Sequence, residues 1–306
     1  MLTILTLLLP LFGLIAIGYI AGRAKIAQLS WVSTLNLFSY YIAFPALILK
    51  SLAFTDLDIS QQGPILLVQF VFSCGLILLT YGVGRWLGLP RTDRNTYMIG
   101  VYFSLAGYIG IPALQLVFGD TAAAEGALIV AVMIAVTLSL GVGLLESSRS
   151  NQVHLKKIVL NVLKNPLLIT TVIGIIIGST QLTIPAAVAQ LITMVAAAAS
   201  PTVLVALGIF IAWNHPKRHA MRIAIKLTTL KLIVIPGVMG LVIWFLPDSH
   251  WLDTTFIQAC MPVAITTFAL AEIYPMDKQA VSSSIVVSTL LSIVIIPLAM
   301  WLAPKL

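Results

Sequence analysis

Continuous apolar runs of about 20 residues fill most of the chain and constrain its fold more than any other feature. Only 9% of the residues are charged, whereas a soluble domain has about a quarter, so this chain cannot cover a surface that faces water. Runs of this length match helices that cross a hydrocarbon core of about 30 Å. Membrane-spanning strands would instead alternate apolar and polar residues over about ten positions. We therefore predict an all-α membrane protein.

Charged residues, Pro and Gly divide the apolar sequence into ten predicted membrane spans. The first five are Leu2–Gly22, Val32–Phe54, Pro64–Leu87, Asn95–Phe118 and Ala122–Leu145. The second five are Val159–Gly178, Ile184–Trp213, Met221–Leu246, Thr254–Ile273 and Val281–Leu302.

Basic residues gather in alternate loops and predict the orientation of the chain. The loops after odd-numbered spans, with the span ends that adjoin them, hold Arg23, Lys25, Arg85, Arg91, Arg94, Arg149, Lys156, Lys157, Lys164, Lys217, Arg218, Arg222, Lys226 and Lys278. The positive-inside rule places these loops in the cytoplasm and both termini outside it, in an inner or plasma membrane. These short loops next to the lipid bilayer account for the net charge of +7, so we expect no nucleic-acid partner.

The two cysteines, Cys74 and Cys260, both lie in apolar runs. They can form neither a disulfide framework nor a zinc cluster, and we expect them to be small buried apolar side chains. We predict no metal and no cofactor.

The chain repeats itself at about half its length, because five Pro and Gly positions recur 156 residues later. The pairs are Pro10 and Pro166, Gly18 and Gly174, Gly22 and Gly178, Pro45 and Pro201, and Gly84 and Gly240. We predict two repeats, 1–145 and 146–306, which enter the membrane from opposite sides because each has five spans. Inverted repeats are typical of secondary transporters, whose two halves exchange roles between inward- and outward-facing states. The alternative is a duplicated helical bundle without transport activity.

The fourth and ninth spans carry Pro and Gly residues that interrupt helices, within Tyr102–Pro112 and Gln258–Thr267. Freed backbone groups at membrane depth are tolerated only inside protein or around a watery cavity, and half-helix N-termini favour an anion. We predict a substrate pocket where the two breaks meet; simple kinks and hydroxyl groups bonded to their own helix are the alternatives. The predicted binding residues are Ser104, Gly107, Tyr108, Gly110, Pro112, Gln258, Pro262, Thr266 and Thr267.

Few ionisable residues lie within the spans. Lys231, in the eighth span, could bind a carboxylate or carry a proton; alternatively it extends to the cytoplasmic surface. Glu272 closes the ninth span and could hold a coupling ion, Na⁺ or H⁺, or be a solvated carboxylate at a helix end. Glu125, near the outer end of the fifth span, is expected to be solvated.

Polar residues and prolines in the second and seventh spans are secondary candidates for the pocket. They are Asn36, Ser39, Pro45, Ser200 and Pro201. Helix packing is the more conservative interpretation, because small and hydroxyl-bearing residues commonly join membrane helices.

Several short stretches, spread over essentially the whole chain, are similar to one known family. They are Tyr41–Leu47, Gly107–Pro112, Asn165 and Pro166 with Gly174 and Gly178, Lys231 with Pro236, Met261–Glu272 and Ser284–Ser292 before Pro297. Together they resemble the auxin efflux carrier family, also called the PIN-like or bacterial malate/malonate permease group. This family belongs to the bile/arsenite/riboflavin transporter superfamily.

The resemblance implies ten helices in two inverted five-helix repeats, with helices 1, 2, 6 and 7 as a scaffold. Helices 3–5 and 8–10 would form a mobile transport domain in which the broken helices 4 and 9 cross. It implies a secondary active, elevator-type carrier that exports or exchanges a small organic anion, such as a dicarboxylate or an aromatic carboxylate, often as a homodimer. The sequence departs from the family at Leu105 and Ala106, where members commonly have Asn-Thr, so a usual substrate contact is missing.

Other functions agree less well with the sequence. A channel would need a continuous polar pore lining, and the spans show no ring of repeated polar residues. An enzyme is not expected, because His154, His215, His219 and His250 fall in predicted loops and no HExxH or GxSxG motif occurs. The alternatives that stay open are a sodium-coupled symporter like the bile-acid carriers and a membrane sensor that does not transport.

Overall fold

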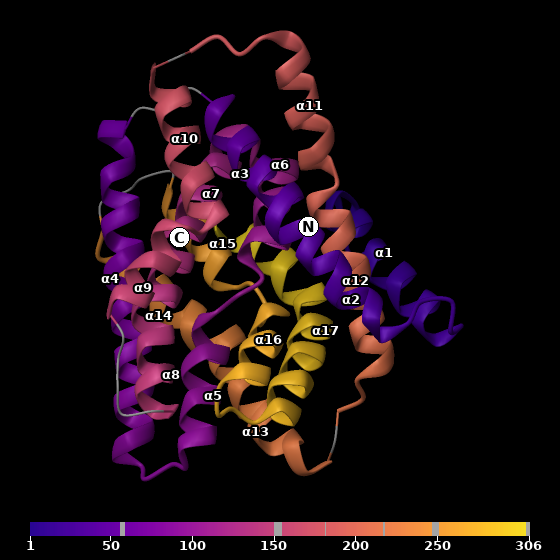
Figure 1. Cartoon of the computed structure of the whole chain (residues 1–306), viewed down its shortest axis with the longest axis vertical. Coiled ribbons are helices and arrows are strands. Elements are labelled where there is room, and N and C mark those ends of the chain that lie inside the picture. The colour runs from indigo at the N-terminus through magenta and orange to yellow at the C-terminus, as the bar shows by residue number, and fades with distance from the viewer. Residues whose placement is uncertain (56–58, 150–154, 181, 217, 247–250, 304–306) are drawn as a thin grey trace. The chain divides into compact units, whose positions relative to one another are not determined.

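A computed structural model describes residues 1–55, 59–149, 155–180, 182–216, 218–246 and 251–303, most of them in helices (Figure 1). His154, Lys217 and His250 lie outside these described residues. Within them, the extended backbone pairs only at an isolated bridge between Ser104 and Val263. The prediction of an all-α membrane protein is therefore confirmed.

The described helices include seven segments long and apolar enough to cross a membrane. They are Leu2–Arg23, Leu29–Ala53, Gly63–Trp86, Asp120–Ser148, Ala186–Trp213, Ala220–Trp244 and Lys278–Leu302. Two shorter apolar helices cover Ala106–Phe118 and Pro166–Thr180. The chain is thus a multi-pass membrane protein.

The chain divides into two structural units, of which unit 1 comprises Met1–Pro64, Gly107–Ala131 and Asn165–Asn214. The helices of unit 1 are α1 (Leu2–Arg23), α2 (Leu29–Phe38), α3 (Phe44–Ala53), α6 (Ile111–Phe118), α10 (Pro166–Thr180), α11 (Ala186–Ala197) and α12 (Ala199–Trp213). α4 (Ile59–Trp86) and α7 (Asp120–Val136) begin in unit 1 and end in unit 2.

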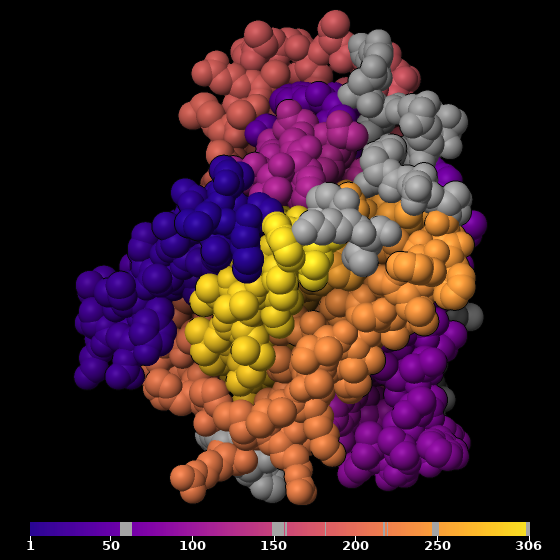
Figure 2. All heavy atoms as spheres, turned by 180° about the vertical axis from the view of Figure 1, so that it is seen from behind, coloured from indigo at the N-terminus to yellow at the C-terminus, as the bar shows by residue number. Residues whose placement is uncertain are grey.

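Unit 2 comprises Ile65–Ala106, Val132–Lys164 and His215–Leu306. Its helices are α5 (Arg91–Tyr102), α8 (Val142–Arg149), α9 (Leu155–Leu163), α13 (Arg218–Thr229), α14 (Ile235–Trp244), α15 (Trp251–Ala259), α16 (Thr266–Ile273) and α17 (Lys278–Leu302). Figure 2 shows α17, in yellow, against the orange segment that contains α13, and these two helices pack together.

Glycine permits the closest helix crossings of unit 1. A Cβ atom on Gly18 of α1 would overlap the carbonyl oxygen of Val205 in α12, and one on Gly208 would overlap that of Ile15. The two backbones therefore touch directly, as α1 and α12 show in Figure 1. A similar approach joins α10 to α3, where a Cβ atom on Gly174 would lie 2.8 Å from the Cβ atom of Leu52.

Four wider, π-helical turns each lead into an α-helix. They are η1 (Ser39–Ala43), η2 (Ala106–Gly110), η3 (Thr137–Gly141) and η4 (Leu230–Val234). In three cases the next α-helix has proline as its second residue, namely Pro45, Pro112 and Pro236. Proline lacks an N–H and its ring clashes with the preceding turn, and a wider turn relieves both problems without ending the helix.

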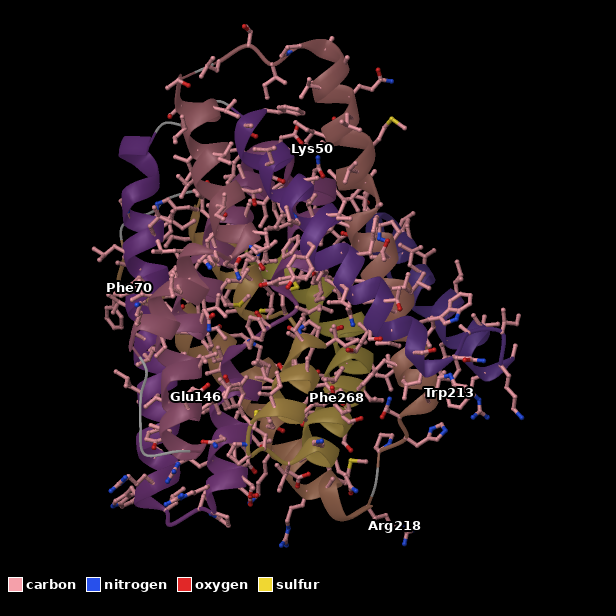
Figure 3. The ribbon with its side chains drawn as sticks, viewed as in Figure 1. Lys50, Phe70, Glu146, Trp213, Arg218 and Phe268 are labelled. Atoms are coloured by element: carbon pink, nitrogen blue, oxygen red, sulfur yellow. The ribbon has the colours of Figure 1, made fainter. Side chains whose placement is uncertain are left out.

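Polar contacts join the ends of several helices in unit 2. The Asn95 amide donates to the carbonyl oxygen of Pro275 (3.0 Å), and the Thr96 hydroxyl accepts from the Asp277 N–H (2.8 Å). Glu146 of α8, labelled in Figure 3, accepts a hydrogen bond from the Tyr274 hydroxyl (3.2 Å). These bonds fix the loop between α16 and α17 to α5 and α8.

Candidate functional site

Two unwound segments meet inside unit 2. α5 ends at Tyr102 and the next helical turn begins at Ala106, while α15 ends at Ala259 and α16 begins at Thr266. The Leu105 N–H donates to the Pro262 carbonyl oxygen (2.8 Å), and the Ala264 N–H donates to the Phe103 carbonyl oxygen (3.1 Å). These reciprocal bonds flank the antiparallel bridge between Ser104 and Val263. We call the two segments, 103–105 and 260–265, the crossing.

The crossing satisfies backbone groups that unwinding has freed, which matters because a buried unpaired N–H is costly. The remaining Val263 N–H donates to the Ser288 hydroxyl of α17 (3.1 Å), and that hydroxyl donates in turn to the Ile285 carbonyl oxygen (3.3 Å). Ser288 is fully buried. Ser288 is not among the predicted binding residues, although the four-residue spacing of Ser284, Ser288 and Ser292 places them on one face of a helix.

Lys231 lies against the crossing. It is 2% exposed, and its ammonium donates to the Tyr102 carbonyl oxygen (3.4 Å), the last one of α5. A helix C-terminus carries partial negative charge, so this contact stabilises the cation. The alternative in which Lys231 extends to the membrane surface is wrong. Polar contacts also fix α5 itself, because the Tyr102 hydroxyl donates to the Met133 carbonyl oxygen (3.0 Å).

Several polar side chains near the crossing have no hydrogen-bond partner among the described residues. Both Oε1 and Nε2 of Gln258 are unpaired, although the residue is only 4% exposed and lies in the last turn of α15. The hydroxyl groups of Thr267 in α16 and Thr289 in α17 are also buried and unpaired. Buried polar groups normally find partners, so these atoms mark places where a polar ligand would be stabilised.

Comparison with known proteins identifies the family. A family model described as "Membrane transport protein" matches residues 3–300. The chain belongs to this family. The predicted membership of the auxin efflux carrier family is thereby confirmed.

Curated relatives of this membrane transport protein match it over nearly their whole length. One is a Rhizobium meliloti protein named "Putative malonate transporter", 26% identical over 94% of this chain and 92% of the relative. The "Uncharacterized transporter" of Methanothermobacter thermautotrophicus is 26% identical over 95% of each chain. The "Uncharacterized transporter YfdV" of Escherichia coli K12 is 24% identical over 97% of this chain and 96% of the relative.

The predicted binding residues of this membrane transport protein fall into two sets. Ser104, Gln258, Pro262, Thr266 and Thr267 belong to unit 2, where Ser104 and Pro262 form part of the crossing. Glu272 is exposed in the last turn of α16. The remaining residues of the prediction, Gly107, Tyr108, Gly110 and Pro112, belong to unit 1.

Packing accounts for two of the unit 1 residues in the transport protein. The Phe44 ring occupies the space that a Cβ atom on Gly107 would need. The Tyr108 ring also packs on Phe44, with 4.4 Å between the ring centroids. Pro112 is the second residue of α6 and lies beyond the unwound segment, unlike Pro262.

The secondary candidates of the transport protein also lie in unit 1, and Ser39 acts there in helix packing. Its hydroxyl donates to the Ala199 carbonyl oxygen (3.2 Å), at the point where α11 gives way to α12. Pro45 and Ser200 are buried, Asn36 is half-buried and Pro201 is exposed.

One expectation about the charged residues of this transport protein is wrong. Glu125 was expected to be solvated, yet it is 1% exposed within α7. No local pattern predicts its burial, because the neighbouring residues that enclose a side chain come from tertiary packing. Among the described residues, no group of three or more His, Cys, Asp or Glu side chains could hold a metal ion.

Proposed function

We propose that this membrane transport protein is a secondary active, elevator-type carrier of a small organic anion, with a dicarboxylate such as malonate as the first candidate. The observation that carries the proposal is the crossing with the buried Lys231 ammonium against it. A cation within a membrane span is costly and usually serves a substrate or ion pathway. The name of the Rhizobium meliloti relative adds malonate as a specific candidate.

The chemistry of the crossing suits an anion. Lys231 supplies positive charge, and the unpaired amide of Gln258 and hydroxyl of Thr267 supply hydrogen bonds. α16 begins at Thr266, and the partial positive charge of a helix N-terminus also favours negative charge. Here Leu105 takes the position of the Asn common in the family, and we propose that Gln258 and Thr267 supply the polar contacts instead.

The contacts within unit 1 support the proposed architecture of ten spans in two inverted repeats. Gly18 meets Val205, and Gly174 meets Leu49. A shift of 156 residues relates Gly18 to Gly174 and Leu49 to Val205, so the two helix pairs use equivalent positions. Unit 1 also contains the first, second and seventh predicted spans and most of the sixth, which supports a scaffold built from those helices.

The contact of Lys231 bears on the coupling ion. Na⁺ would need several oxygen ligands, and a carbonyl freed by unwinding is a suitable one. The Tyr102 carbonyl already holds an ammonium group, so we propose coupling to H⁺, or anion exchange, rather than a Na⁺ ion at this carbonyl. We keep Glu272, at the far end of α16, as a second candidate for the coupling group. We also propose that both termini lie outside the cytoplasm and that the protein forms a homodimer.

Uptake into proteoliposomes tests this function. We expect saturable, counter-substrate-stimulated uptake of radiolabelled malonate that persists when Na⁺ is replaced by K⁺. Lys231→Met should abolish this uptake, whereas the exposed Lys226→Met, one helical turn and a residue away, should retain it. Absence of uptake of any dicarboxylate or aromatic carboxylate by the folded protein would contradict the proposal and favour a sensor. An absolute requirement for Na⁺ would favour the symporter alternative.

A further inference from the structure

We propose that the protein binds its dicarboxylate substrate with one carboxyl group protonated, and that the Gln258 amide recognises that neutral carboxyl group. This inference rests on the proposed function and specifies the protonation state of the substrate. It follows from the number of charges buried in unit 2 and from the two unpaired atoms of one side chain.

The buried charges allow for only one negative charge on the substrate. Among the described residues, the buried charged side chains are Glu125, in unit 1, and Lys231, in unit 2. A doubly ionised dicarboxylate at the crossing would therefore leave one negative charge without a buried cation. An uncompensated charge in a buried site is strongly disfavoured, and the usual response is to take up a proton. A singly protonated substrate carries one negative charge, which Lys231 neutralises.

Gln258 has the groups that a protonated carboxyl requires. Its Oε1 accepts and its Nε2 donates, and neither has a partner among the described residues. A carboxylic acid also presents one donor, its O–H, beside one acceptor, its C=O. The two groups can therefore pair through two reciprocal hydrogen bonds. An ionised carboxylate only accepts, so it would leave Gln258 Oε1 unpaired and facing a negative charge.

Few protein groups near Gln258 can produce a competing pH dependence. α14 and α17 pack against α15; α14 has no ionisable residue, and the only one in α17 is its first residue, Lys278. α15 itself contains Asp253, and Cys260 follows it. Partial burial raises the pKa of the Asp253 carboxyl, so this group needs a control of its own. In the part of the chain that the structure describes, the other ionisable groups at the crossing are Lys231, Tyr102 and Cys74, which interacts with Tyr102.

Two ligands that differ in a single group provide the test. Malonamate carries one carboxylate and one carboxamide, and its carboxamide presents the same donor and acceptor edge as a carboxylic acid but does not ionise. We would measure the Kd of malonate and of malonamate for the purified protein between about pH 5 and about pH 8 by calorimetry. Above the second pKa of malonate, its Kd should rise about tenfold per pH unit, because the monoanion becomes scarce. The Kd of malonamate should stay constant.

Variants test whether Gln258 is the residue that recognises the protonated carboxyl group. Gln258→Met keeps the length of the side chain but removes both hydrogen bonds, and it should weaken both ligands by on the order of tenfold. Asp253→Asn should leave the pH dependence of malonate unchanged. Monomethyl malonate, whose ester only accepts, should bind more weakly than malonamate.

Three results would overturn the inference. The first is a malonate Kd that stays constant or falls as the pH rises, in a protein that does not bind malonamate. This result would mean that the protein binds the malonate dianion, and it would leave the proposed carrier function intact. The second is a malonate pH dependence that disappears in Asp253→Asn, and the third is Gln258→Met with unchanged affinities. Binding of neither ligand at any pH would contradict the proposed malonate specificity itself. The comparison of the two ligands uses the unaltered protein, so it decides the question even where Gln258→Met does not fold.

Discussion

Units 1 and 2 fill their interiors with different side chains. Of the 24 buried polar or charged residues among those described, 18 belong to unit 2 and six to unit 1. Unit 1 instead depends on direct backbone contact, as at Gly18 and Gly208, where no side chain fits between the helices. Close packing through small residues gives a rigid assembly in a membrane, whereas buried polar groups are retained for function. The difference supports the proposed binding site in unit 2.

Interrupted helices show the same contrast. In unit 1, the residue between α11 and α12 is Ala198, and it keeps helical dihedral angles of φ −80° and ψ −16°. In unit 2, Phe103 after α5 has φ −77° and ψ 112°, so the chain is extended. An extended segment frees backbone donors and acceptors from the helix, and here they bond to a second unwound segment. The interruption between α11 and α12 in unit 1 is therefore a bend, whereas the chain after α5 in unit 2 is unwound.

The largest loss of stability is expected from a single methyl group in unit 1. Gly18→Ala would place a Cβ atom on the carbonyl group of Val205, and α1 would have to move away from α12. We expect a cost of about 3 kcal/mol, as for severe overpacking, measured as a lower thermal unfolding midpoint in detergent. Gly13→Ala is the control on the same helix, because nothing lies within 4 Å of its new Cβ atom. Equal midpoints for the two variants would mean that unit 1 is not held by backbone contact.

A smaller loss is expected from removing one hydroxyl group in unit 2. Ser288→Ala leaves the Val263 N–H without its acceptor, and a buried unpaired donor costs about 2 kcal/mol. Ser292→Ala removes a hydroxyl from the same face of α17, but that hydroxyl donates to the Thr289 carbonyl oxygen of its own helix. We expect Ser288→Ala alone to lower both the unfolding midpoint and malonate uptake. If Ser292→Ala had the same effect, the crossing would not depend on Ser288.

The two breaks show how far the sequence predicts the site. Pro262 correctly indicated an unwound segment between α15 and α16, because proline cannot donate to the helix. Its counterpart, Phe103–Leu105, contains neither Pro nor Gly, and Pro112 lies beyond the break in α6. This segment is extended because its backbone pairs with residues about half the chain away, and such tertiary pairing leaves no local signal.

Side-chain partners were harder still to predict. The sequence correctly indicated helices, apolar spans and the family, because composition and periodicity determine these features. The burial of Lys231 depends on a carbonyl oxygen 129 residues away. In the same way, Ser288 contacts the crossing because α17 passes the Val263 N–H.

Helix caps provide a comparison in which the units should behave alike. The Asn165 side chain accepts from the Leu167 N–H in unit 1 (2.9 Å), and the Asp277 side chain accepts from the Gln279 N–H in unit 2 (3.0 Å). The Asn165 amide also donates to the Tyr40 hydroxyl (2.7 Å), so Asn165→Ala is compared in a Tyr40→Phe background. In that background Asn165→Ala should cost about 1 kcal/mol, as Asp277→Ala should in the unaltered chain, because this is the usual value for a lost N-cap. Chemical unfolding in mixed micelles would measure both. A large difference between them would mean that unit 1 and unit 2 differ in stability and not only in the chemistry of their interiors.

The smallest change in stability is expected from Lys231→Met, the variant that should abolish transport. Lys231→Met removes a buried charge, which favours the folded state, but it leaves the Tyr102 carbonyl oxygen without the ammonium donor, which opposes it. These effects nearly cancel, so we expect the free energy of unfolding to change by less than about 1 kcal/mol. Malonate should then fail to raise the unfolding midpoint of the variant, although it raises that of the unaltered protein. A strongly destabilised Lys231→Met would show that the lysine holds unit 2 together, and the polar interior would then serve structure as much as binding.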